Sequence, residues 1–328
     1  MSMNSVLNSK ENKAASNILQ TKKVAIVIPV KNRPDLLEEC LSSLVDQDFS
    51  INECEVLLCD DCSEDDLEIV VNRFRERIPK IQLLRQKESK GPAAARNMGF
   101  RSSLAAIFVC VDNDIVWEQD FLPRIIDALE THPKWVAVQG FLLPKGNMNS
   151  ILYDAPESNG QVYLSGVSAY RADALLKVGG FDETFLLPAC EDADLAARLL
   201  KIGDYGYVPG AVAYHPTRRV TLQTHWRWRR HWKYEMFLAK RYGFLSFPGH
   251  PAGPFPRLRV ALAAVVTLPA GRFIEGLKYI KHKPIQGMLA CFYAIFDVFC
   301  GVWSLPSILF SKVPPQRNFL SGDCIHQG

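Results

Sequence analysis

Acidic residues directly follow an apolar segment near the middle of the chain. Asp112, Asn113 and Asp114 come after the run IFVCV. Carboxylates in such a triplet can bind a hard divalent cation and leave coordination positions open for the oxygens of a diphosphate. Taken alone, the triplet is more typical of a solvated turn, so its meaning depends on the other acids of the chain.

A second pair of acids, Asp60 and Asp61, ends an apolar segment in the string CDDCSED. Carboxylates at this point could accept hydrogen bonds from a ribose or from the edge of a base. The structural alternative is a helix cap formed by Asp61 or Ser63. These residues alone leave both interpretations open.

Small residues and one arginine begin the next predicted helix. The string GPAAARNMGF covers residues 91–100 and contains Arg96. Backbone amides at a helix start and a guanidinium group suit an anionic ligand. Close packing of alanines against a sheet is the structural alternative.

A third acid pair, Glu191 and Asp192, begins the amphipathic segment EDADLAARLLKIG. A carboxylate within hydrogen-bond reach of a hydroxyl can act as a general base, and a helix start is expected to keep it ionised, which limits its strength. The structural alternative is an acidic first turn, with Asp194 and Arg198 forming an ion pair one turn apart.

The elements that position these groups alternate between strands and helices. VAIVIPV at residues 24–30 predicts a buried parallel strand, and the leucine spacing after Asp35 predicts a helix. Further strands are expected at CEVLLCDD, IQLLRQ and AAIFVCVDND, with helices at EDDLEIVVNRFRERI and at 92–104. This alternation predicts an open, mainly parallel α/β sheet with the polar clusters 31–35, 60–63 and 112–114 at its ligand-binding edge.

The order of these motifs resembles the family 2 glycosyltransferases. The series reads IPVKNRPDLLEECLSSL, DDCSED, GPAAARNMGF, VDND, GGFDETF and EDADLAARL, and it covers about residues 23–215. The resemblance implies an α/β fold of the GT-A type, with an open mixed sheet flanked by helices. It also implies a nucleotide-diphospho-sugar donor, with a UDP-sugar favoured, a divalent metal, Mg²⁺ or Mn²⁺, and transfer with inversion.

The same resemblance assigns roles to individual residues. Asp192 would be the catalytic base, with Glu191 beside it. The metal would be bound by Asp112, Asp114 and His215, although a lone histidine is as often structural. The acceptor side would contain Gly180, Phe181 and Asp182, while Cys190 stands where many relatives have glycine. The residues expected to bind the nucleotide sugar are Pro29, Asn32, Asp60, Asp61, Arg96 and Asp112.

The composition changes past about Pro216, which predicts three parts of the chain: a disordered tail at 1–22, a GT-A domain at 23–216 and a helical region at 217–328. Segment 218–241 interleaves Trp226, Trp228 and Trp232 with basic residues, as in helices that lie in a membrane interface. Binding of a lipid-linked diphosphate is an alternative. Nucleic acid is not expected as a partner, because no known nucleic-acid-binding module accompanies the segment.

Segment 287–310 is apolar and long enough to cross a bilayer, with Asp297 as its only charged residue. Asp297 and Pro306 weaken that interpretation, so a re-entrant or monotopic anchor and a packing interface with a partner subunit remain alternatives. Segment 260–270 is too short to cross alone. Basic residues flanking both segments predict that the catalytic domain lies at the cytoplasmic face of the membrane.

Composition and missing motifs exclude several other classes. With 38 basic and 35 acidic residues the formal net charge is only +3, so no global field favours nucleic acid. Nine scattered cysteines fit a reducing compartment, and the pair Cys59 and Cys62 is interpreted as structural. PVKNRPD after the first strand contains no glycine, which disfavours nucleotidylyltransferases and dehydrogenases. An inactive membrane-associated nucleotide-sugar-binding or scaffold protein remains the alternative.

Overall fold

The computed structural model describes residues 24–146, 150–154, 158, 162–246, 248, 251 and 253–317. The chain divides into two compact units. The first comprises Met1–Leu143, Glu157–His215 and Gln316–Gly328, and the second comprises Pro144–Pro156 and Pro216–Pro315. The predicted tail at 1–22 lies outside the described residues, and the ranges 23–216 and 217–328 stay predictions.

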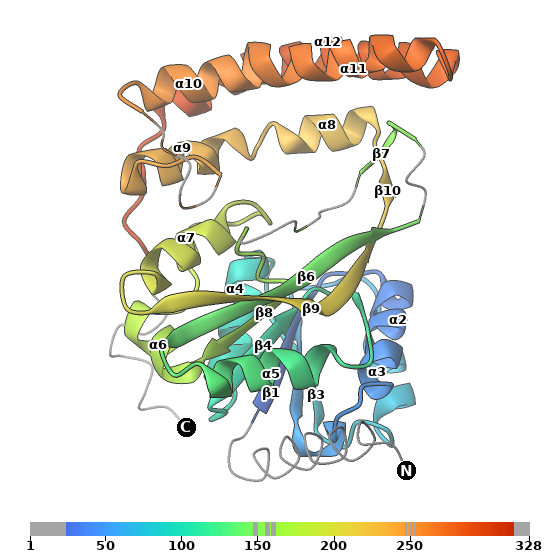
Figure 1. Cartoon of the computed structure of the whole chain (residues 1–328), viewed down its shortest axis with the longest axis vertical. Helices are drawn as coiled ribbons and strands as arrows, with labels where there is room; N and C mark the ends of the chain where they lie inside the picture. The colour runs from blue at the N-terminus through green and yellow to red at the C-terminus, as the bar shows by residue number, and fades with distance from the viewer. Residues whose placement is uncertain are drawn as a thin grey trace, which may run out of the picture. The chain divides into compact units, whose positions relative to one another are not determined.

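A mixed sheet forms the centre of the first unit (Figure 1). Among the described residues it has eight strands in the order β3-β2-β1-β4-β8-β6-β9-β5. The strands β1 to β4 are parallel, whereas β8 runs antiparallel to β4 and to β6. The strand bounds are β1 Val24–Val30, β2 Glu55–Asp60, β3 Ile81–Arg85, β4 Ile107–Val111, β5 Val116–Trp117, β6 Trp135–Lys145, β8 Val167–Arg171 and β9 Asp204–Pro216.

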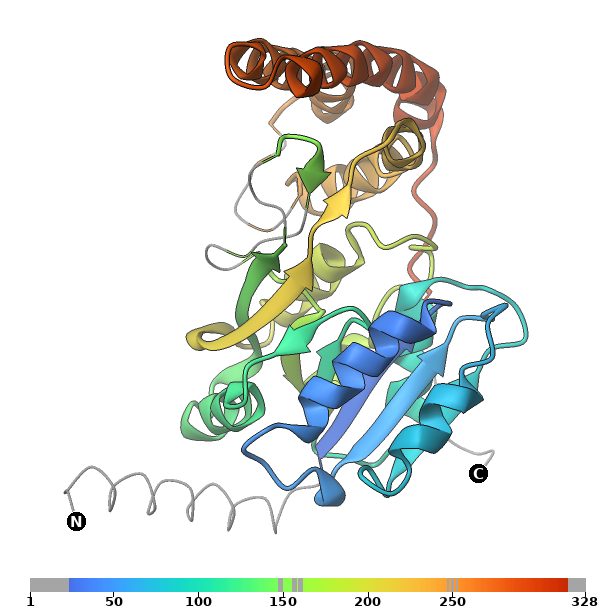
Figure 2. The ribbon, with the colours of Figure 1, turned by 90° about the vertical axis from the view of Figure 1, so that its right-hand side faces the viewer.

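Helices cover both faces of this sheet because alternate residues of each strand point to opposite sides. Ile26 and Ile28 of β1 belong to the core cluster that contains residues of α2 and α3, and these two helices lie on one face (Figure 2). Val27 points the other way, towards Gly99 of α4, where an added Cβ would lie only 2.7 Å from the valine. The helices of this unit are α2 Pro34–Val45, η1 Ile51–Glu53, α3 Glu68–Phe74, α4 Pro92–Arg101, α5 Phe121–Thr131, α6 Ala172–Val178 and α7 Glu191–Leu199.

The strand order creates a ligand-binding edge next to β1. From β1 the chain moves to β2 and β3 on one side and returns to β4 on the other. The registers pair Val30 with Asp60 and Val27 with Cys110, so the carboxyl ends of β1, β2 and β4 meet at one edge. Such a switch point is where open α/β sheets bind ligands. The predicted strands and helices and the mixed sheet are therefore confirmed. The expectation of a mainly parallel sheet is corrected, because β8 pairs antiparallel with β4 and β6, and β9 pairs antiparallel with β5.

Helices dominate the second unit. Its two long helical segments, Pro256–Ile280 and Pro284–Phe310, lie against each other and are called the apolar hairpin below. The helices α8 and α9 pack on this hairpin (Figure 1). The elements are β7 Tyr153–Asp154, β10 Arg218–Arg219, α8 Leu222–Trp228, α9 Trp232–Tyr242, α10 Pro256–Leu262, the π-helical turn η2 Ala263–Thr267, α11 Leu268–Ile280 and α12 Pro284–Phe310.

The sequence predicts 260–270 as a separate short apolar segment, and this prediction was wrong. That segment is the middle of a continuous helix of 25 residues, and both arms of the hairpin are long and apolar enough to cross a bilayer by length and composition. The helix is hard to recognise in the sequence because its apolar run is interrupted by Arg257, Arg259 and Arg272. The helical period continues through them.

Candidate active site

Arg96 lies at the centre of a cluster of carboxylates in the first unit. It comes from α4, and its side chain is 3% exposed. One terminal nitrogen lies 2.7 Å from Asp112 Oδ1, after β4, and the other lies 3.3 Å from Glu191 Oε1, at the start of α7. The guanidinium group also lies over the ring of Phe181, 5.2 Å from its centre. Arg96 therefore joins two acids that are 79 residues apart in the chain.

Asp192 is held beside this cluster by a serine from another part of the chain. Ser165 Oγ donates to Asp192 Oδ1 at 2.7 Å, and the Ser165 amide donates to Asp192 Oδ2 at 3.1 Å. The carboxylate is partly buried. These two hydrogen bonds fix its plane, as a base that must face a substrate hydroxyl requires.

The crowding of acids shifts their titration. The pKa of Glu191 is raised to about 8, because burial and the Asp192 carboxylate raise it by more than Arg96 lowers it. Burial also raises the pKa of Asp192, although Arg96 and Ser165 oppose the shift. The expectation that the helix start leaves Asp192 a weak base is therefore corrected, because desolvation is the larger effect. A raised pKa makes a carboxylate a stronger base once it is ionised.

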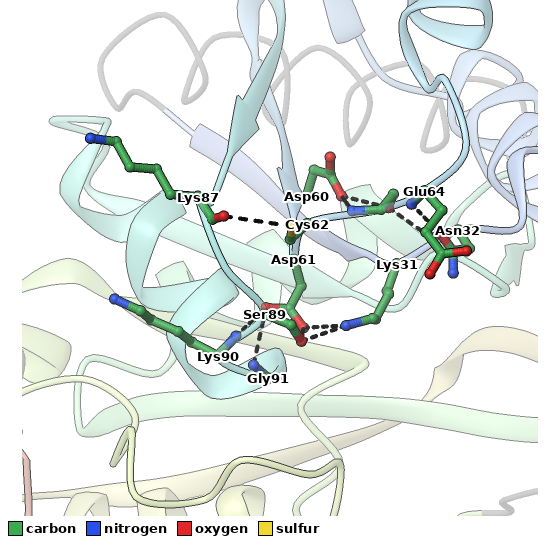
Figure 3. A network of polar contacts seen from close by, with 11 residues as sticks. Lys31, Asn32, Asp60, Asp61, Cys62, Glu64, Lys87, Ser89, Lys90 and Gly91 are labelled. Carbon is green, nitrogen blue, oxygen red and sulfur yellow. Dashed lines mark hydrogen bonds and ion pairs between the residues drawn. The ribbon is translucent and has the colours of Figure 1, made fainter.

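Asp61 occupies the helix start that the sequence offers to an anionic ligand. Its Oδ1 accepts from the amides of Lys90 and Gly91 at 2.6 and 3.0 Å, directly before α4 (Figure 3). Its Oδ2 accepts from Ser89 Oγ at 2.7 Å and lies 3.4 Å from Lys31 Nζ. The anion at the start of α4 is thus a side chain of the protein itself.

Asp60 is fully buried and closes the turn after β2. Its Oδ1 accepts from the amide and the hydroxyl of Ser63 at 2.8 and 2.5 Å, and its Oδ2 lies 3.5 Å from Arg85 Nε. The capping alternative is wrong, because the next helix, α3, begins at Glu68 after Leu67 and has no side-chain cap from Asp61 or Ser63. Contact of Asp60 or Asp61 with a nucleotide stays a prediction.

Asn32 ties the loop after β1 to the loop after β2. Its amide donates to Ser63 Oγ at 2.7 Å, and its Oδ1 accepts from the amide of Glu64 at 2.8 Å. Asn32 and Arg33 both have a φ of 58°, so the chain turns sharply after β1. Pro29 is partly buried within β1, opposite Cys59 of β2. The residues of this region that are predicted to bind the nucleotide sugar therefore lie at the ends of β1 and β2 or in the two loops that follow. Hydrogen bonds connect these loops.

Asp114 and His215 bring together two atoms that can bind a metal. His215 Nε2 lies 3.5 Å from Asp114 Oδ1, and both side chains are buried. Arg33 Nη1 lies 3.3 Å from Asp114 Oδ2. The separation of the imidazole and carboxylate atoms fits one cation between them, with substrate oxygens completing its coordination, as is usual for Mg²⁺ at phosphates. Within the described part of the chain, no three histidine, cysteine or acidic side chains form a complete metal site.

Known proteins are similar to this chain in sequence and in fold. Residues 25–164 match the model of glycosyl transferase family 2. Glycosyltransferase AglE of Haloferax volcanii is 29% identical over 106 residues, which cover 32% of this chain and 35% of AglE. The poly(ribitol-phosphate) beta-glucosyltransferase of Bacillus spizizenii is 34% identical over 93 residues, which cover 28% and 15% of the two chains. The alignments thus span well under two thirds of these relatives.

Among solved structures, the mannosyltransferase PcManGT of Pyrobaculum calidifontis, in complex with GDP-Man and Mn²⁺, is similar with a TM-score of 0.59. The identity is 21%, and the match covers 87% of each chain. Residues 25–164 of the chain thus carry a region of glycosyl transferase family 2. The sheet is the GT-A fold that the motif order implies.

Hydrogen bonds from other parts of the chain hold the predicted acceptor loop of this glycosyltransferase in place. Gly180, Phe181 and Asp182 are buried, and Asn97 of α4 pairs with the backbone of Phe181 through two hydrogen bonds of 2.9 Å. Asp182 Oδ1 accepts from the amides of Thr184 and Arg317 at 2.9 and 3.1 Å. The acceptor role of Gly180, Phe181 and Asp182 stays a prediction.

Arg198 holds the same loop from α7. It pairs with Asp194 at 2.7 Å, as the spacing of four residues predicts, and it donates to the carbonyl of Gly180 at 2.6 Å. Cys190, just before α7, has a φ of 68°, in the left-handed region that glycine adopts most easily. The backbone at this position therefore takes a conformation that suits glycine, although the residue here is cysteine.

Four residues of this family 2 site were not predicted from the sequence: Arg33, Asn97, Ser165 and Gly166. A Cβ on Gly166 would lie 2.6 Å from Asp112 Oδ2, so only glycine leaves room for that carboxylate. Arg33 and Asn97 stand inside the quoted motifs IPVKNRPD and GPAAARNMGF, which was the available signal. Ser165 and Gly166 have no such signal, because their partners are 27 and 54 residues away.

The eight described cysteines are all free thiols. Burial raises the pKa of Cys59 to about 12, so this thiol stays protonated near neutrality. Cys62 Sγ lies 3.8 Å from the carbonyl of Lys87 (Figure 3). The structural interpretation of this CxxC pair stays a prediction.

Proposed function

We propose that this chain transfers a sugar from a nucleotide-diphospho-sugar to a hydroxyl group of a glycan or a lipid-linked saccharide, with inversion at the anomeric carbon. The observation that carries the proposal is the group of three carboxylates, Asp112, Glu191 and Asp192, around the single buried Arg96. Glu191 is buried and Asp192 is partly buried, and desolvated acids that outnumber their cation are costly to folding unless they serve chemistry.

Asp192 is the general base of the proposed reaction. The acceptor oxygen bonds to the anomeric carbon as the bond from that carbon to the diphosphate breaks, and its electrons leave with the diphosphate oxygen. The acceptor proton passes to the Asp192 carboxylate, which Ser165 keeps oriented. The raised pKa of Asp192 favours this transfer.

Asp114 and His215, with Asp112 beside them, would bind a divalent cation, Mg²⁺ or Mn²⁺. The distance of 3.5 Å between His215 Nε2 and Asp114 Oδ1 supports this assignment, as does the Mn²⁺ in the complex of the similar mannosyltransferase. When bound, the metal neutralises negative charge on the leaving nucleotide diphosphate. Arg33 supplies a fixed positive charge at the same edge.

The direct test is release of nucleoside diphosphate from a panel of UDP-sugars and GDP-mannose, with Mn²⁺ or Mg²⁺ and with a chelator as control. We expect one donor to be consumed and the chelator to stop its turnover. A chain that neither binds nor consumes any donor contradicts the proposal. Donor binding without any turnover, also with candidate acceptors, would support the inactive scaffold alternative.

A second proposal concerns location: the second unit attaches the enzyme to the cytoplasmic face of a membrane. Two apolar helices and the interleaved tryptophans and arginines of α8 support it. Flotation of the full chain with vesicles containing anionic lipid tests this, and full recovery in the soluble fraction contradicts it.

A further inference from the structure

Each arm of the apolar hairpin exposes a row of large apolar side chains. On α12, Met288, Ile295 and Val302 stand seven residues apart and are 55%, 62% and 50% exposed. Residues seven apart lie almost on one line along a helix. The other arm adds exposed Leu262, Val266, Ile274 and Leu277. A row therefore runs along each arm.

The two arms are packed closely through small residues. A Cβ on Gly276 would lie 2.7 Å from Cys291 Sγ, and a Cβ on Gly301 would lie 2.3 Å from the carbonyl oxygen of Ala264. Substitution at either position would push the helices apart. The hairpin is thus a two-helix plate rather than two separate helices.

A different side of α12 is covered by the basic helix α8, which runs lengthwise along it (Figure 1). His225 packs on Tyr293, Trp226 packs on Phe299 and Trp303, and Ser304 Oγ donates to the carbonyl of Arg229 at 3.1 Å. The contacts advance along both helices in the same direction. In a membrane, α8 must therefore lie at the same depth as the middle of α12.

Polar groups gather where these helices meet. Asp297, halfway along α12, lies 2.5 Å from Arg272 Nη1 of α11 and 2.6 Å from His225 Nδ1 of α8. A cavity of about 280 Å³ opens beside this triad, and Asp154 and Glu235 are among its lining residues. The middle of the hairpin therefore contains a cluster of charged and polar groups.

Exposed charges lie at the same level. Arg227 and Arg230 are exposed on or directly after α8, and Glu275 is exposed on α11 between Arg272 and Lys278. A hairpin that crossed a bilayer would carry the triad, the cavity and these exposed charges to the hydrocarbon centre. Ionised groups there are rare and face a protein interior or water.

We infer that the apolar hairpin lies in the plane of the membrane, with its rows of apolar side chains in one leaflet and α8 on the headgroup side. Cations stand at both ends of the plate, Arg257 and Arg259 at one and Lys281 and Lys283 at the turn, where an in-plane hairpin meets one anionic headgroup layer. The inference rests on the proposed membrane attachment and is independent of the transfer reaction.

Depth measurements on α12 test this arrangement. Met288→Cys, Ile295→Cys and Val302→Cys are each spin-labelled in the full chain bound to vesicles with anionic lipid, and the unsubstituted protein gives the background of its own thiols. The outer two sites are about 21 Å apart along the helix. Equal depths at all three sites support the inference. A label at 295 that lies much deeper than the one at 288 overturns it in favour of a spanning helix.

The side of the membrane on which the turn lies gives a second measurement. In host cells, His282→Cys and the reference Leu104→Cys, exposed in the first unit, are treated with a membrane-impermeant maleimide. We expect both variants to react in inverted vesicles and neither in intact spheroplasts. Reaction of the His282→Cys variant only from the opposite side overturns the inference.

Failure of attachment is recognised separately. Protein that does not float with vesicles contradicts both the membrane proposal and this inference, and a dimer in that soluble fraction would assign the apolar rows to a second copy. Donor turnover, measured on the same samples, still decides the proposed reaction.

Discussion

Two pairs of adjacent acids show how similar strings acquire different roles. Asp60 and Asp61 receive hydrogen bonds from amides and hydroxyls of neighbouring loops, and each also lies near one cation. Glu191 shares Arg96 with a third acid, Asp112, and Asp192 accepts hydrogen bonds from Ser165. Four donors surround Asp61, while Asp60 has two donors on Oδ1 and Arg85 near its Oδ2. The second pair instead depends on one guanidinium and one serine, and its pKa values are raised.

The difference teaches that a carboxylate pair is best judged by the donors around it. A carboxylate supplied with several donors is held ionised and stabilises its loop. Carboxylates that compete for one guanidinium retain affinity for a proton, which is what a catalytic base requires. The following predictions test whether this contrast separates structural from catalytic acids.

The largest effect is expected for Asp192→Asn. Loss of the base should reduce kcat by about 10²- to 10⁴-fold, the usual contribution of general base catalysis, while the melting temperature changes little. Steady-state turnover of the preferred donor measures this. Asp173→Asn is the matched control, because Asp173 is an exposed acid in the first turn of α6. Full activity of Asp192→Asn would remove the assignment of the base.

Arg96→Gln should cause the largest loss of stability. Removing one member of a buried ion pair costs about 3–5 kcal/mol, because its partners remain buried and uncompensated. Denaturant unfolding measures the change. Arg101→Gln is the control, since Arg101 is an exposed member of the same helix with one ion pair to Glu183. Equal, small losses in both variants would show that Arg96 is not the centre of the cluster.

Asp61→Asn should weaken folding and leave the chemistry almost unchanged. The variant loses the charge that four donors surround, and we expect a cost of about 1–3 kcal/mol in unfolding free energy with kcat within a few-fold of the parent. Unfolding and kinetics on the same preparation test both parts. A large rise in donor KM without loss of stability would instead assign Asp61 to donor binding.

The fold was largely predictable because its signals are local. The runs 24–30 and 107–111 have the length and β-branched composition of buried strands, and α2 and α7 have clear helical periods. The short strand β5 has only two residues and escaped prediction. The helix Pro256–Ile280 was recognised only in part because its charged residues interrupt the apolar run.

The candidate site was predictable in its residue types and much less in its contacts. Motif order pointed to Asp112, Glu191, Asp192 and Arg96, but their meeting depends on helices and strands that are distant in sequence. The role of Asp61 as the anion at the start of α4 follows from the β2–β1 register and the position of α4. No local pattern contains that information.

The smallest effect is a change in how stability depends on pH. Glu191 binds its proton more tightly in the folded chain than unfolded, so the folded state holds more protons between about pH 4.5 and 8. Stability from this group is therefore fully present below that window and falls as pH rises through it, at most by about 1.4 kcal/mol per pH unit for one proton. Glu191→Gln removes the titration, so its unfolding free energy should fall less between pH 5 and 8 than that of the parent. Parallel curves for the two proteins would mean that Arg96 keeps Glu191 ionised, and the contrast with Asp60 and Asp61 would then rest on Asp192 alone.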